Sequence, residues 1–106
     1  MPDLTLTEAD NGRPVAVHVG DAITIRLPEN ASTGYRWSAA GVDRAHVSVD
    51  PPRIERTSEA VGSAGTSVWT VRATQPGTTR LELRKARSWE QSAIERFTID
   101  ITVAER

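Results

Sequence analysis

Apolar and polar side chains alternate along much of this chain with a period of two. The alternation is clearest in five segments, which are residues 15–19, 22–27, 69–73, 81–84 and 97–103. In a β-strand, a period of two places every second side chain on the same face. Each segment is therefore expected to be a half-buried strand whose apolar side chains face a core. No window of the sequence gives a helical face of useful length.

Clusters of turn-forming residues separate these segments. The clusters are Asn11-Gly12, Val19-Gly20-Asp21, Ala40-Gly41, Pro51-Pro52 and Gln75-Pro76-Gly77. Seven or eight short strands at this spacing predict an all-β fold, an immunoglobulin-like antiparallel β-sandwich. One core suits a chain of 106 residues, so we expect a single domain over residues 1–106.

Composition and charge exclude several classes of partner. The chain has no cysteine, which excludes disulfides, thiolate metal ligands and thiol nucleophiles. A net charge of −1 with scattered basic residues favours neither nucleic acid nor an anionic membrane as a partner. The first residues show no secretory signal. We expect a cytoplasmic monomer, although a processed or trimmed N-terminus remains an alternative.

The residue types needed for catalysis do not gather in the sequence. His18 and His46 are the only histidines, and neither lies in a metal-binding spacing. Ser32 and Ser88 have no evident base and orienting acid beside them. The sequence therefore predicts a binding protein rather than an enzyme, with no cofactor and no metal.

Three segments between the predicted strands are candidates for a binding surface. Residues 28–34 form a longer connection than a hairpin needs, and extra loop length on a β-scaffold is typical of binding sites. Residues 59–66 are rich in small side chains, and residues 86–92 carry Trp89 outside any alternating pattern. Two interpretations of Trp89 stay open. It either folds back as a lid over one end of the sandwich or is displayed as an aromatic anchor beside Arg87.

The remaining aromatic residues have different expected roles. Trp69 is in register with Val71, and Trp37 lies near the start of a strand, so both tryptophans are expected in the core. Tyr35 shares a strand face with Trp37 and is expected to brace the preceding loop.

In order and spacing, the three segments resemble those of the chagasin-like inhibitors of papain-type cysteine proteases. Asn30-Ala31-Ser32-Thr33-Gly34-Tyr35 resembles the family's Asn-Pro-Thr-Thr-Gly-Tyr loop, Gly62-Ser63-Ala64-Gly65 its Gly-x-Gly-Gly loop, and Arg87-Ser88-Trp89 its Arg-Pro-Trp loop. The resemblance runs from about Val19 to the C-terminus. Ala31, Ser32, Ala64 and Ser88 depart from the family pattern.

This resemblance implies a reversible, tight-binding inhibitor whose three loops wedge into the active-site cleft of a papain-like cysteine protease. The implied protease-binding residues are Asn30, Ala31, Ser32, Thr33, Gly34, Tyr35, Gly62, Ser63, Ala64, Gly65, Thr66, Arg87, Ser88 and Trp89. The alternatives are an interaction module of the same fold with a different target, and a domain whose loop motif serves only packing.

Overall fold

The computed structural model describes residues 4–29, 34–42, 45–56, 65–87 and 93–105. In this part of the chain there are nine strands and one short 3-10 helix. In chain order the elements are β1 (Leu4–Thr7), η1 (Glu8–Asp10), β2 (Pro14–His18), β3 (Ala22–Glu29), β4 (Tyr35–Gly41), β5 (Val47–Val49), β6 (Arg53–Arg56), β7 (Gly65–Ala73), β8 (Gly77–Arg87) and β9 (Glu95–Ala104).

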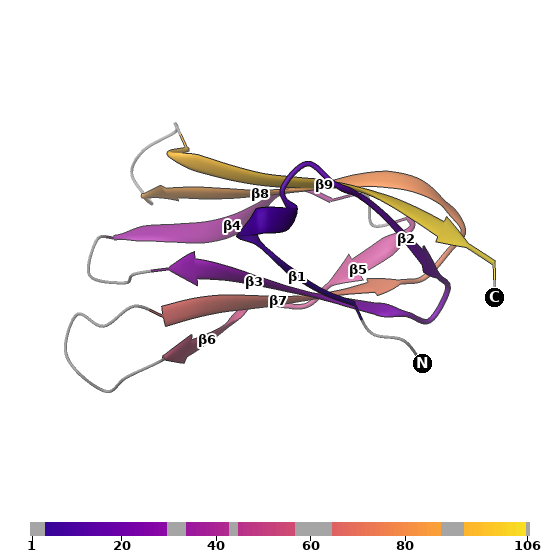
Figure 1. The fold of residues 1–106 in the computed structure, drawn as a ribbon, viewed down its shortest axis with the longest axis horizontal. Helices are drawn as coiled ribbons and strands as arrows, with labels where there is room; N and C mark the ends of the chain where they lie inside the picture. Colours follow the sequence, from indigo (N-terminus) through magenta and orange to yellow (C-terminus); the bar gives the residue numbers. More distant parts are fainter. Residues whose placement is uncertain (1–3, 30–33, 43–44, 57–64, 88–92, 106) are drawn as a thin grey trace.

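The strands form two sheets that pack face to face (Figure 1). The first sheet has the order β1-β3-β7-β5, and β6 also pairs with β7. The second sheet has the order β2-β9-β8-β4. The predicted all-β sandwich is confirmed. The described residues form nine strands where seven or eight were expected, because β1, β5 and β6 are too short to show an alternating pattern.

Two strand pairings are parallel, which the predicted antiparallel sandwich did not include. They are the pairing of β1 with β3 and that of β2 with β9. Both arise because the N-terminal part of the chain starts on the first sheet and then crosses to the second. The crossing is made by η1, which has a capping box. Thr7 Oγ1 accepts from Ala9 N at 3.4 Å, and Asp10 Oδ2 accepts from Thr7 N at 2.9 Å.

The core lies between the sheets and consists of the inward side chains of the alternating strands. The apolar side chains with at most 1% exposure are Ile23, Ile25, Leu27, Val47, Val71, Leu81, Leu83, Phe97, Ile99 and Ile101. Trp37 and Trp69 are 6% and 4% exposed, so both are core residues as predicted. The predicted turn at Ala40-Gly41 is wrong. These residues lie in β4, where the register with β8 shifts between Ala39 and Gly41, so the glycine marks a bulge.

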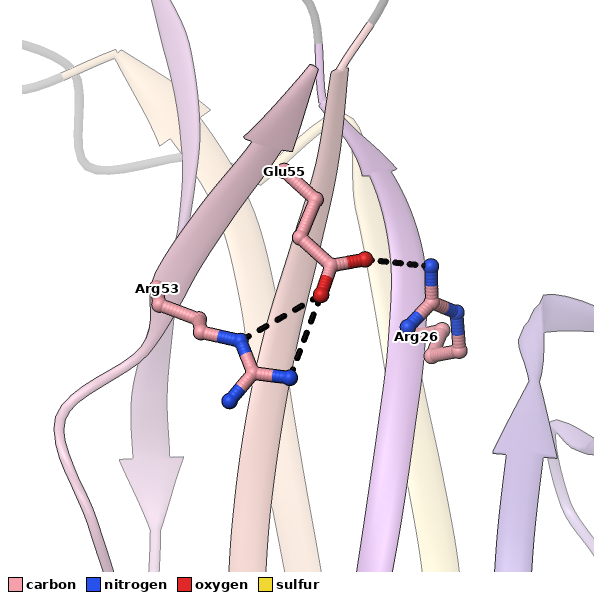
Figure 2. Close-up of polar contacts among 3 residues, drawn as sticks. All are labelled: Arg26, Arg53 and Glu55. Carbon is pink, nitrogen blue, oxygen red and sulfur yellow. Dashed lines mark hydrogen bonds and ion pairs between the residues drawn. The ribbon is translucent and has the colours of Figure 1, made fainter. Parts of the chain in front are cut away.

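A charged cluster spans three strands of the first sheet. Figure 2 shows the Glu55 carboxylate of β6 between Arg26 of β3 and Arg53 of β6. Arg26 donates to Glu55 Oε1 at 2.6 Å, and Arg53 donates through Nη2 to Oε2 at 3.1 Å. The hydrogen bond from Arg26, and then that from Arg53, holds the pKa of Glu55 below its usual value. The cluster links the short strand β6 to β3 across β7.

Gly77 begins β8 in a conformation that disfavours other residues. Its φ is +143°, and a Cβ atom there would overlap the imidazole of His46. The carbonyl of His46 accepts hydrogen bonds from Thr74 N at 2.9 Å and Gln75 N at 3.3 Å. The β7–β8 turn and His46 therefore form one packed unit.

We expect Gly77→Ala to lower the free energy of unfolding by about 1–3 kcal/mol, since it adds backbone strain and a steric overlap. Chemical denaturation of the variant and the wild type measures the difference. The double variant His46→Ala, Gly77→Ala removes the overlap and should recover part of the loss. A single variant as stable as the wild type would contradict the packing described.

Candidate functional site

The three segments singled out in the sequence leave the sandwich at the same end. In the first sheet, Gly65 at the start of β7 pairs with Glu29 at the end of β3 and with Arg56 at the end of β6. In the second sheet, Tyr35 at the start of β4 pairs with Arg87 at the end of β8. The connections β3–β4, β6–β7 and β8–β9 thus begin side by side, at the left of Figure 1. Within each sheet, the strand register thus makes neighbours of strand ends that are far apart in sequence.

Five of the predicted site residues lie in the described part of the chain, and all five flank these connections. They are Gly34, Tyr35, Gly65, Thr66 and Arg87. The other nine lie outside the described residues and stay predictions. They are Asn30, Ala31, Ser32, Thr33, Gly62, Ser63, Ala64, Ser88 and Trp89.

Gly34 has a φ of +80°, in the left-handed region that favours glycine. It directly precedes β4, so it sets the direction in which the chain enters this strand. A non-glycine side chain at this position would be strained.

Tyr35 connects two of the three segments. The Arg87 guanidinium carbon lies 4.4 Å from the centroid of the Tyr35 ring, within cation–π range. The two residues face each other across β4 and β8. Two residues further along the same strands, Lys85 Nζ lies 5.9 Å from the centroid of the Trp37 ring. The ends of β4 and β8 therefore carry cations packed on aromatic rings, which restricts the starting points of both connections.

Gly65 and Thr66 have a different environment. Gly65 is buried and Thr66 is half-buried, and both lie within β7. Each pairs with β3 on one side and with β6 on the other. These two residues hold the strand from which the β6–β7 connection leaves.

Sequence reasoning missed Glu29, which belongs to this end of the molecule. Its side chain is buried, and its Oε1 accepts a hydrogen bond from the backbone N of Trp37 at 2.7 Å. In return, Trp37 Nε1 donates to the carbonyl of Pro28 at 2.9 Å. The signal was present in the sequence, because Glu29 continues the inward series of Ile25 and Leu27.

The described part of this end offers backbone groups, aromatic rings and cations. Across the described residues, no group of three or more His, Asp or Glu side chains could hold a metal ion. His46 packs at the opposite end, beside the start of β8. No helix among the described residues is long and apolar enough to cross a membrane. This end is suited to contact another molecule through its surface.

Comparison with known proteins identifies the family. The family model described as Chagasin family peptidase inhibitor I42 matches residues 16–103. Chagasin from Trypanosoma cruzi is 30% identical over 101 residues, which cover 89% of this chain and 92% of chagasin.

Solved structures share the fold. A cysteine protease inhibitor from Entamoeba histolytica, EhICP2, has a TM-score of 0.85 at 24% identity, with 96% of each chain covered. The solution structure of amebosin gives 0.83 at 25% identity, covering 98% of this chain and all of amebosin. PbICP-C, solved in complex with falcipain-2, gives 0.61 at 18% identity and covers 100% of this chain and 91% of its own. The chain belongs to the chagasin family of peptidase inhibitors, so it is a peptidase inhibitor and not an enzyme.

Proposed function

We propose that this inhibitor binds papain-like cysteine proteases reversibly and tightly by seating one end of the sandwich in the active-site cleft. The observation that carries the proposal is that the strand ends flanking the β3–β4, β6–β7 and β8–β9 connections lie at that one end. These connections contain the family-like segments. PbICP-C, a protein of the same fold, has been solved in complex with falcipain-2.

Each segment has its own part in the proposal, by analogy with the family. Residues 32–34 approach the catalytic cysteine and histidine and exclude substrate and water. Arg87 and Trp89 lie over the primed side of the cleft, and residues 62–66 run along the non-primed side. No scissile bond is presented, so the inhibitor is not consumed. A standard interface buries about 800 Å² on each partner.

The side chains at these strand ends are already held in place in the free protein, which supports tight binding. Arg87 is stacked on Tyr35 before any partner arrives, and Glu29 is already bonded to Trp37. Groups that are ordered in the free protein lose less conformational entropy on association.

Titration of active papain with the purified protein tests the proposal. The expected result is stoichiometric loss of activity, recovery of activity after dilution, and an inhibitor of unchanged mass after incubation. A folded protein that leaves papain fully active would overturn the proposal. That result would favour an interaction module with a different target.

Two arginines on β8 allow a test of whether the protease contacts this end of the sandwich. Arg87→Ala is expected to raise the inhibition constant about tenfold, because it removes a cation and the ring contact at the proposed interface. Arg80→Ala is the control. Arg80 lies toward the other end of the strand in an exposed ion pair with Asp100 at 2.9 Å, which contributes little to stability. Equal inhibition by both variants would argue against binding at this end.

A further inference from the structure

Glu29 is a buried carboxylate at the base of the proposed binding end. It is 7% exposed and is the last residue of β3. Removing a carboxylate from water is costly unless hydrogen bonds compensate. The preceding inward residues of the same strand are Ile25 and Leu27, so an apolar side chain would continue the core at this position. Packing alone therefore does not explain why a carboxylate occupies this position.

The carboxylate joins the two sheets. Glu29 belongs to β3 in the first sheet, while Trp37 belongs to β4 at the edge of the second. Glu29 Oε1 accepts from the Trp37 backbone N–H at 2.7 Å, the length of a charge-assisted hydrogen bond. The Trp37 indole Nε1–H donates in the opposite direction, to the carbonyl of Pro28 at 2.9 Å. Two hydrogen bonds thus tie neighbouring points of β3 and β4.

These two hydrogen bonds link the residues on either side of the β3–β4 connection. Glu29 is the last residue of β3, and Tyr35 is the first residue of β4. The bond from Glu29 to Trp37 therefore fixes the separation of the two strand ends between which residues 30–34 run. On the other side of Glu29, backbone pairing with Gly65 ties the same point to the start of β7. Glu29 is in contact with the bases of two of the three converging connections.

We propose that Glu29 is a positioning residue for protease inhibition. Its carboxylate does not face the partner; it holds the ends of β3 and β4 at the spacing that residues 30–34 need in order to enter the cleft. This inference rests on the proposed function. It predicts a loss of affinity that lost folding does not explain. Replacing the carboxylate by an apolar side chain leaves the buried Trp37 N–H without its acceptor and so lowers stability, but inhibition by the folded fraction falls only if the carboxylate positions the strand ends.

Two variants separate positioning from stability. Glu29→Leu continues the apolar series but removes the acceptor, whereas Glu29→Gln keeps an amide oxygen that accepts the same hydrogen bond. We expect Glu29→Leu to raise the inhibition constant for papain at least about tenfold at a temperature where it is fully folded. Glu29→Gln should stay within about threefold of the wild type. Circular dichroism and chemical denaturation establish the folded fraction of each variant.

Nuclear magnetic resonance tests, without the protease, whether Glu29 holds the ends of β3 and β4 together. In amide correlation spectra, the Trp37 backbone proton should be shifted downfield in the wild type and in Glu29→Gln, and should move upfield in Glu29→Leu. Amide hydrogen exchange at residues 34–36 should become faster only in Glu29→Leu.

The outcomes distinguish this inference from the proposed function. If the wild type does not inhibit papain, the proposed function fails. In that case, unchanged amide hydrogen exchange at residues 34–36 in Glu29→Leu would also overturn the inference that Glu29 holds the ends of β3 and β4. If the wild type inhibits and Glu29→Leu inhibits equally well, the positioning role is overturned and the proposed function stands. If Glu29→Leu does not fold, Glu29→Gln decides, and a tenfold loss of inhibition with an unchanged Trp37 amide would overturn the inference.

Discussion

Gly34→Val is expected to weaken inhibition of papain by about 30-fold or more. Gly34 has a φ of +80°, and a β-branched residue is a clear outlier at positive φ. Holding valine there costs roughly 1–3 kcal/mol, and each 1.4 kcal/mol is a factor of ten in affinity. The chain relieves this strain by moving to negative φ, which changes the direction of residues 30–33 relative to β4. Either the strain or the redirection lowers affinity.

A graded series at this position provides the control. Asparagine tolerates the left-handed region and alanine tolerates it less. The inhibition constants should therefore rise in the order glycine, asparagine, alanine, valine. Melting temperatures measured on the same proteins show how much of the effect comes from lost folding. Valine inhibiting as well as glycine would count against both the conformation of this residue and its insertion into a cleft.

The long strands could be predicted from the sequence because each has one face on a single core. Ile23 and Ile25 in β3, and Ile99 and Ile101 in β9, are fully buried and alternate with polar neighbours. The short strands gave no such signal. Ile54 in β6 is 48% exposed, and β6 is held by backbone pairing with β7 and by the Arg26–Glu55 ion pair. Edge strands held this way need no alternating pattern.

The two parallel pairings depend on tertiary structure. The sequence Thr7-Glu8-Ala9-Asp10 forms a capping box, which indicates that a short helix begins after Thr7. It does not indicate that the chain changes sheets there. That change depends on which edges, those of β3 and β9, are free to pair with the N-terminal strands.

The sequence pointed to residues at this end of the sandwich, but it did not predict the contacts among those that the structure describes. Gly34 stands between a loop and a strand, where glycine often adopts the positive φ that it has here. The contact between Tyr35 and Arg87 depends on the register of β4 with β8, which no local pattern specifies. Glu29 was overlooked because it lies beside turn-forming residues, although the period of β3 places its side chain inward. Extending each strand by one step of its period would have found it.

The three tryptophans of this chain have different expected roles. Trp37 and Trp69 are both buried in the core. Trp89 lies outside the described residues, two positions after the end of β8 and beside the proposed contact of Arg87. Tryptophan and arginine are the residue types that most often dominate binding energy at interfaces.

Trp89→Ala is expected to reduce affinity for papain by at least about 2 kcal/mol, or about 30-fold, and to leave the melting temperature nearly unchanged. Trp69→Phe is the matched control. Trp69 is 4% exposed within β7, so a smaller ring there leaves unfilled space and lowers stability, while inhibition by the folded fraction stays the same. Trp89→Ala should therefore change the inhibition constant and not the melting temperature, whereas Trp69→Phe should change the melting temperature and not the inhibition constant. If Trp89→Ala instead lowers the melting temperature and inhibits like the wild type, Trp89 packs as a lid on the sandwich, and the affinity must come from the other two connections.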